Sequence, residues 1–214
     1  MRKLVWLCGL FLALAVPAMA QDELPKFDVF GGYSYVRFND HVGGGLGDFH
    51  SNLNGGSGSV AFYPSEHFGV VADFGGYKIS TLTGSAVTAL AGANSIGVSS
   101  SAITYLFGPR VRFGHGGVTP FAQVLFGGAH VADITTNNSA ACTTIGATAP
   151  CTLTKSDNAF ALTAGGGVDF KIARHFALRG QAEYLMTRFK EPNTTTATRE
   201  SQNNARISVG IVIH

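Results

Sequence analysis

After residue 20 the sequence has no long apolar run, no cluster of basic residues and only two cysteines. The absence of an apolar run of about 20 residues argues against a membrane-spanning helix. Nucleic-acid binding needs a basic patch or stripe, so we expect no nucleic-acid partner. Two cysteines without a neighbouring histidine motif do not form a zinc site, so we expect no metal and no cofactor.

Residues 1–20 have the pattern of a cleaved secretory signal. Arg2 and Lys3 form a basic start, residues 4–16 are apolar, and Ala18 and Ala20 flank Met19 in a small-x-small cleavage pattern. We therefore expect one mature domain over residues 21–214. Without Arg2 and Lys3, the 13 remaining basic residues balance the 13 acidic ones, so the mature chain is formally neutral.

Export also sets the expected state of the two remaining cysteines. Thiols of exported proteins meet an oxidising compartment, so Cys142 and Cys151 are predicted to form a disulfide. The loop between them is short, and the chain-entropy model assigns such a bond about 2.5–3 kcal/mol of stability.

The rest of the sequence alternates between two unlike faces with a period of two, which indicates β-strands. Residues 98–131 show this best, as two strands joined by a glycine-rich turn at 114–117. The predicted strands cover residues 26–38, 53–63, 68–79, 96–113, 118–131, 159–172, 176–189 and 205–214. Their connections alternate between long and short, which together with the even strand number is typical of an outer-membrane barrel.

Polarity decides which face meets which solvent. An arginine facing lipid at the bilayer midplane costs roughly 2–4 kcal/mol, so several would exceed the whole stability of a domain. The polar face is therefore predicted to line the barrel interior as a network of Asp28, Asp73, Arg110, Gln123, Asp169, Arg179, Gln181 and Glu183. The opposite face is predicted to contact lipid through Tyr33, Tyr35, Phe74, Tyr105, Phe107, Val124, Phe126, Phe160, Phe170 and Tyr184.

Four stretches also resemble a known family. Residues 27–35, 107–110, 119–123 and 176–184 are similar to segments of OmpA-like transmembrane-domain proteins, the outer-membrane β-barrel domain family. The resemblance implies an all-β, eight-stranded antiparallel up-and-down barrel in the outer membrane of a Gram-negative bacterium. It also implies insertion by the barrel-insertion machinery, which usually reads a C-terminal aromatic residue. This chain has His214 at that position, which predicts weaker recognition.

An eight-stranded barrel is only wide enough to hold its own side chains. We therefore expect the inward charges to pair and fill the lumen of a monomeric, non-enzymatic barrel. Its long loops would present a surface to an extracellular partner. The alternatives are a narrow ion or solute channel, a soluble lipocalin-like ligand carrier, and a lipid-modifying barrel enzyme.

Overall fold

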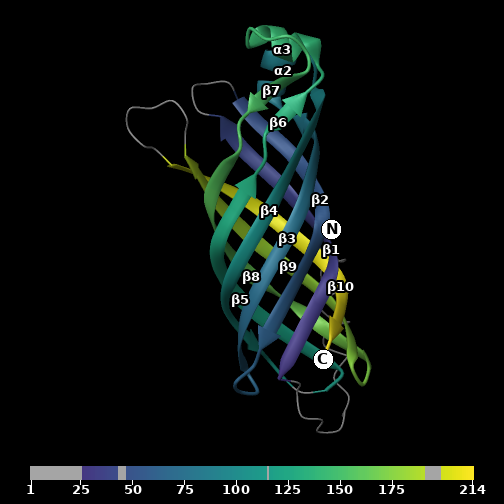
Figure 1. Cartoon of the computed structure of the whole chain (residues 1–214). Coiled ribbons are helices and arrows are strands. Elements are labelled where there is room, and N and C mark those ends of the chain that lie inside the picture. Colours follow the sequence, from purple (N-terminus) through teal and green to yellow (C-terminus); the bar gives the residue numbers. More distant parts are fainter. Residues whose placement is uncertain (1–25, 43–46, 115, 191–198) are drawn as a thin grey trace, which may run out of the picture.

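The computed structural model describes residues 26–42, 47–114, 116–190 and 199–214. Within these residues, eight antiparallel strands form a barrel (Figure 1). They are β1 (Phe27–Val42), β2 (Gly47–Phe62), β3 (Phe68–Thr83), β4 (Ser95–Arg112), β5 (Val118–Val131), β8 (Asp157–Ala173), β9 (Phe176–Lys190) and β10 (Arg199–Ile213). The prediction of an eight-stranded up-and-down barrel is confirmed.

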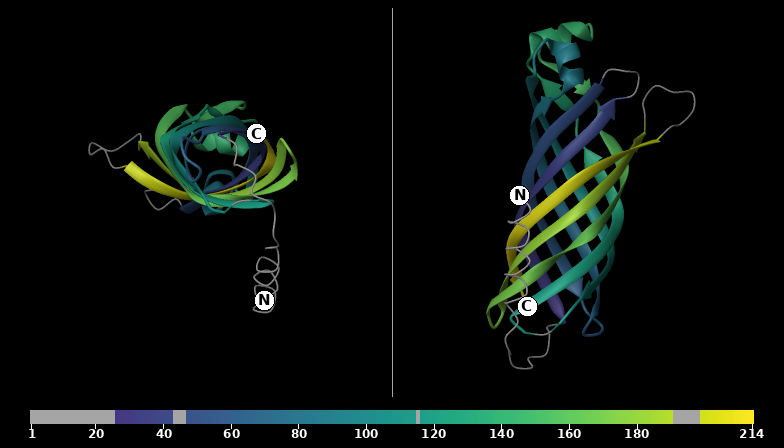
Figure 2. Two further views of the ribbon diagram at one scale, coloured as in Figure 1. Left: turned by 90° about the horizontal axis from the view of Figure 1, so that it is seen from below. Right: turned by 180° about the vertical axis from the view of Figure 1, so that it is seen from behind.

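Each strand pairs with the next barrel strand along the chain, and β1 pairs with β10 to close the cylinder. Seen from below, the strands form a flattened ring (Figure 2). Short connections lie at one end, which we call the turn end. The opposite end, which we call the cap end, carries two helices and a small hairpin. The closing pairs run from Val29 and Ile213 to Arg37 and Ala205, and along them neither strand has a free edge.

Side chains alternate between buried and exposed along the strands, as the period of two requires. On β4 the alternation runs through nearly the whole strand, so Leu106 and Arg110 are buried while Tyr105 and Phe107 are exposed. The exposed side is rich in aromatic and branched aliphatic residues, and the buried side includes most of the charged residues of the strands. The barrel therefore has polar groups inside and apolar groups outside, the reverse of a water-soluble barrel.

The strands extend further toward the cap end than the sequence predicted. Residues 39–52 were expected to form a long loop, but β1 and β2 stay paired as far as Val42 and Gly47. The predicted end of the loop at 190–204 is also wrong, because β10 already begins at Arg199, where it pairs with Lys190. The backbone ladder continues there although the apolar alternation has stopped. Hydrogen bonding between strands does not require that one face be apolar.

The predicted loop at 132–158 contains structure of its own. Strands β6 (Ile134–Thr136) and β7 (Cys151–Thr154) pair with each other and flank helix α3 (Ser139–Thr144). A second short helix, α2 (Ser85–Ala91), lies in the connection between β3 and β4. Figure 1 shows these elements together above the strands. We call them the cap.

Candidate functional site

The lumen near the turn end is organised around Arg179 on β9. Its Nε atom donates to Asp169 Oδ1 at 2.6 Å and its Nη2 atom donates to Asp169 Oδ2 at 2.7 Å, a two-pronged contact. Asp28 on β1 lies 3.5 Å from Nη2 and also contacts His214 Nδ1 at 2.9 Å. Arg179 therefore bridges β8 and β1, which are not neighbours in the sheet, across the interior.

A second arginine, Arg206 on β10, occupies the middle of the lumen. Its Nε donates to Glu183 Oε2 at 2.7 Å, and its Nη1 donates to Asp73 Oδ1 at 2.7 Å. The Tyr77 hydroxyl lies 3.4 Å from the same Nη1. Arg206 is 1% exposed, so these charge pairs are shielded from water and from salt. The contact from β10 to Asp73 on β3 again crosses the barrel.

Glutamine side chains extend this cluster toward β4. Arg110 Nε donates to Gln123 Oε1 at 2.7 Å, and Gln123 Nε2 donates to Glu183 Oε1 at 2.6 Å. Gln181 Nε2 lies 3.4 Å from Glu183 Oε2. The two oxygens of Glu183 thus link arginine and glutamine side chains from three strands. Such a network holds its members in one arrangement because each group depends on its neighbours.

Toward the cap end the lumen becomes apolar. Val36, Leu53, Ile79 and Leu185 are buried there in one cluster that also includes Val87 of helix α2. Buried charge pairs thus occupy the lower and middle parts of the lumen, and buried apolar side chains run beside them up to the cap end. The lumen was predicted to be filled largely by inward charges, and apolar side chains share it with them.

At the turn end the ring of Tyr63 lies against the lumen mouth. The guanidinium carbon of Arg112 is 3.7 Å from the centre of this ring, and Arg112 Nε donates to the Glu66 carbonyl at 2.7 Å. Burial raises the pKa of the Tyr63 phenol above its ordinary value. Tyr63 also belongs to the apolar cluster of the lumen, so the stacked pair connects the turn end to that cluster.

All eight residues predicted to form the interior network are buried inside the barrel. The predicted set omits Arg206 and Arg112, although both are buried arginines of the lumen. The period of two already places Arg206 on the same face as Ser208 and Arg112 on the same face as Arg110, so parity alone would have found them. The contacts of Tyr63 and His214 had no such signal, because Tyr63 follows the end of β2 and His214 follows the end of β10.

The ten residues predicted to face lipid lie on the outer side of the wall. All are exposed except Tyr35, which is half-buried. Tyr35 donates to Asn52 Oδ1 at 2.7 Å, and Tyr33 and Tyr184 make the same contact with Asn54 and Asn203. These pairs lie where the outward positions change from apolar to polar. Aromatic residues at such a border are typical of the interface girdle of membrane barrels.

The elements of the cap are bonded to one another and pack against the barrel. Cys142 of α3 and Cys151 of β7 form a disulfide with a Cα–Cα distance of 5.8 Å. Ala141 and Val87, from α3 and α2, are buried in the apolar cluster of the upper lumen. The Asn138 side chain accepts a hydrogen bond from the Ala141 amide and so caps α3. The cap is thus a packed extension of the barrel core.

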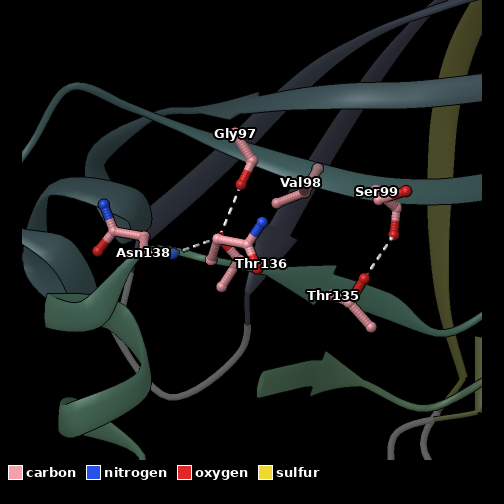
Figure 3. A pocket seen from close by; sticks show the side chains of 7 residues that line it. Gly97, Val98, Ser99, Thr135, Thr136 and Asn138 are labelled. Carbon is pink, nitrogen blue, oxygen red and sulfur yellow. Dashed lines mark hydrogen bonds between the residues drawn. The ribbon is translucent and has the colours of Figure 1, made fainter. Parts of the chain in front are cut away.

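A pocket of about 420 Å³ lies beside the pairing of β6 with β4. It is lined by Gly97, Val98, Ser99, Thr135, Thr136, Asn137 and Asn138. Figure 3 shows Thr135 and Thr136 donating to the carbonyls of Ser99 and Gly97 along one side. The lining carries hydroxyl, amide and peptide groups and no charged side chain.

Residues 6–212 match the family model described as the outer membrane protein beta-barrel domain. The chain belongs to this family. The predicted resemblance is confirmed, and membership implies the outer membrane of a Gram-negative bacterium. Comparison with curated proteins finds no sequence match.

Neisserial surface protein A, a solved structure with a TM-score above 0.5, agrees with the family in fold. It is 13% identical, and the match covers 88% of this chain and 97% of that one with a TM-score of 0.52. Ail, the attachment invasion locus protein of Yersinia pestis, is 12% identical over 89% and 100% of the two chains, with a TM-score of 0.49. The outer membrane protein W of E. coli is 13% identical over 91% and 100%, with a TM-score of 0.46. At these identities the likeness concerns the fold alone.

Two further features of this outer-membrane barrel bear on its chemistry. Within the residues that the structure describes, no helix is long and apolar enough to cross a membrane. Across the same residues, no group of three His, Cys, Asp or Glu side chains is placed to hold a metal ion. The expected signal, residues 1–20, lies outside the described part of the chain and stays a prediction.

Proposed function

We propose that this chain is a monomeric, non-catalytic outer-membrane barrel whose lumen is closed and whose cap contacts an external partner. The signal would be cleaved after Ala20, and the insertion machinery would place the barrel with its turn end toward the periplasm. The outer wall, from Phe27 and Phe62 up to the tyrosine–asparagine border, would then contact lipid. The observation that supports the proposal is that buried side chains occupy the lumen at three successive levels, around Arg179, around Arg206 and in the apolar cluster.

Closure at three levels argues for a surface role over conduction. An ion would have to separate Arg179 from its two carboxylates, then Arg206 from Asp73 and Glu183, and then pass the apolar cluster. Breaking one buried ion pair costs about 3–5 kcal/mol, which makes spontaneous passage rare. Planar-bilayer recordings of the purified monomer should therefore show no large, stable conductance. A steady open level from the wild-type monomer would instead support the narrow channel.

The cap supplies the surface for a partner. Residues 84–94 and 134–154 contain no Asp, Glu, Lys or Arg. A polyanion gains little from such a surface, because electrostatic attraction is what draws it to a protein. The uncharged pocket by Ser99 and Asn137 suits neutral groups that donate and accept hydrogen bonds, such as the hydroxyls of a glycan. We therefore expect the partner to be neutral.

Deletion of residues 136–154 tests the role of the cap. The deletion removes α3, β7, the disulfide and three of the seven residues that line the pocket, and leaves all eight barrel strands. Cells that carry the deletion should adhere less to a matrix-coated surface, and the purified variant should lose binding on a panel of neutral glycans. A panel of sulfated glycans serves as the charged comparison. Unchanged adhesion and glycan binding by a variant that still shows the mobility of a folded barrel on unboiled gels would remove this part of the proposal.

A further inference from the structure

The lumen arginine Arg110 donates a hydrogen bond to a neutral partner. Arg110 is 1% exposed, and its Nε atom donates to the uncharged Gln123. The guanidinium carbon lies 4.4 Å from the centre of the Phe121 ring. Its two terminal nitrogens, Nη1 and Nη2, make no hydrogen bond of normal geometry among the described residues, and the hydroxyl that interacts with this side chain, that of Tyr63, is neutral. A fully buried cation in this situation is costly unless a counter-charge is near.

The lumen carboxylates do not supply that counter-charge directly. Asp28 and Asp169 bond to Arg179, while Asp73 and Glu183 bond to Arg206. Arg110 reaches Glu183 only through the amide of Gln123. All four acids predicted for the interior network are thus engaged by two arginines.

A second guanidinium lies at the same ring. The central carbon of Arg179 is 4.7 Å from the centre of Phe121, and its Nη1 atom also lacks a partner among the described residues. Beside Phe121, two buried cations therefore have three guanidinium nitrogens that, in the described part of the chain, make no hydrogen bond of normal geometry and no contact with a carboxylate. The like charges repel each other, and the negative face of the ring, over which both guanidinium groups lie, attracts them but carries no full counter-charge.

We propose that the lower lumen binds a chloride ion at Arg110, beside Arg179 and Phe121. An anion accepts the free N–H groups and offsets the repulsion of the two cations, whereas a water molecule would provide an acceptor but no charge. Both arginines are buried, so the ligand must be small enough to be enclosed. A halide meets that condition better than sulfate, phosphate or a carboxylic acid.

Thermal melting in detergent tests the proposal on the full barrel. At equal ionic strength, sodium chloride or bromide should raise the apparent melting temperature above that in sodium gluconate or sulfate. Occupancy at about ten times the dissociation constant corresponds to a rise of about 3–6 °C for a chain of this size. An identical melting temperature in chloride and gluconate would mean that water alone occupies the place, and would overturn the proposal.

Two variants locate the effect. Arg110→Gln should lose the difference between chloride and gluconate, while Arg37→Gln, an exposed arginine of the outer wall, should keep it. If Arg110→Gln does not fold, Arg110→Lys replaces it in the test. Lysine preserves the charge but loses the fork of donors, so the halide response of Arg110→Lys should be smaller than that of the wild type. Crystals grown in bromide should show an anomalous peak within contact distance of the Arg110 side chain. A halide response that survives in folded Arg110→Gln, or bromide crystals without that peak, would place the ion elsewhere and refute the assignment.

Discussion

Replacement of Arg206 by methionine is the sharpest test of the closed lumen. Methionine keeps much of the side-chain volume but removes the donors to Asp73 and Glu183. Both carboxylates are buried, with 1% and 0% of their side chains exposed. Removing one partner from a buried ion pair typically costs about 3–5 kcal/mol. We expect the loss of unfolding free energy in Arg206→Met to lie in this range. It should not reach the sum for two broken pairs, because Glu183 keeps its hydrogen bond from Gln123 at 2.6 Å.

The loss should come from the carboxylates that are left behind. Combining Arg206→Met with Asp73→Asn and Glu183→Gln removes those charges, and this triple variant should recover most of the lost stability. Buried ion pairs can often be replaced by neutral side chains of similar volume at little cost. Arg37→Met, on the exposed side of β1, is the matched control and should change stability by no more than about 0.5 kcal/mol.

The measurement is the free energy of unfolding by urea in lipid vesicles, with the folded fraction read from mobility on unboiled gels. If Arg206→Met cost no more than the Arg37→Met control, water would already be screening the cluster and the lumen would be open at this level. If the triple variant were less stable than Arg206→Met alone, the stranded carboxylates would not be the source of the loss. Either result would refute the reasoning.

Three other perturbations probe the wall, the mouth and the cap. Gly108→Ala should weaken barrel closure by about 1–3 kcal/mol or more, because its Cβ would lie 2.1 Å from the Val124 carbonyl oxygen, whereas Gly76→Ala, with nothing within 4 Å, should fold normally on the same gels. Because the pKa of Tyr63 is raised, its contribution to stability is present below the ordinary phenol value of 10.0 and is lost as pH rises through the higher value of the folded state. The melting temperature of Tyr63→Phe should therefore fall less steeply with rising alkaline pH than that of the wild type. Equal slopes would exclude Tyr63 as the source. Changing Cys142 and Cys151 together to serine should cost at most about 2.5–3 kcal/mol and speed hydrogen exchange in residues 136–154 alone; faster exchange throughout the barrel strands would show that the bond does more than stabilise the cap.

The alternation of side chains was readable from the sequence because a strand turns successive residues to opposite faces. Arg110, Arg179 and Glu183 each occupy a position of the polar face in the two-residue repeat of their own strand. That position alone placed them inside. The unequal polarity of the two faces then determined which face must avoid lipid. Strand number and the order of long and short connections followed from the same pattern.

Contacts across the lumen depended on the tertiary structure. Arg206 meets Asp73 at a separation of 133 residues, and Arg179 meets Asp28 at a separation of 151. Parity says that such groups share an interior, but partner choice depends on strand register, barrel tilt and side-chain length together. The extension of β1 and β10 beyond the apolar pattern was equally hidden, because backbone hydrogen bonds between strands leave no mark in composition.

The cap shows the same division. Export and cysteine count were enough to predict that Cys142 and Cys151 would bond. Helices α2 and α3 were not predicted, since six or seven residues are too few to display a helical period. Their formation depends on burying Val87 and Ala141 against the upper lumen. The sequence by itself determined which residues face inward and which outward, because that depends only on local backbone geometry and solvent. The closed barrel decided which of the inward residues meet, because only its register brings distant strands face to face.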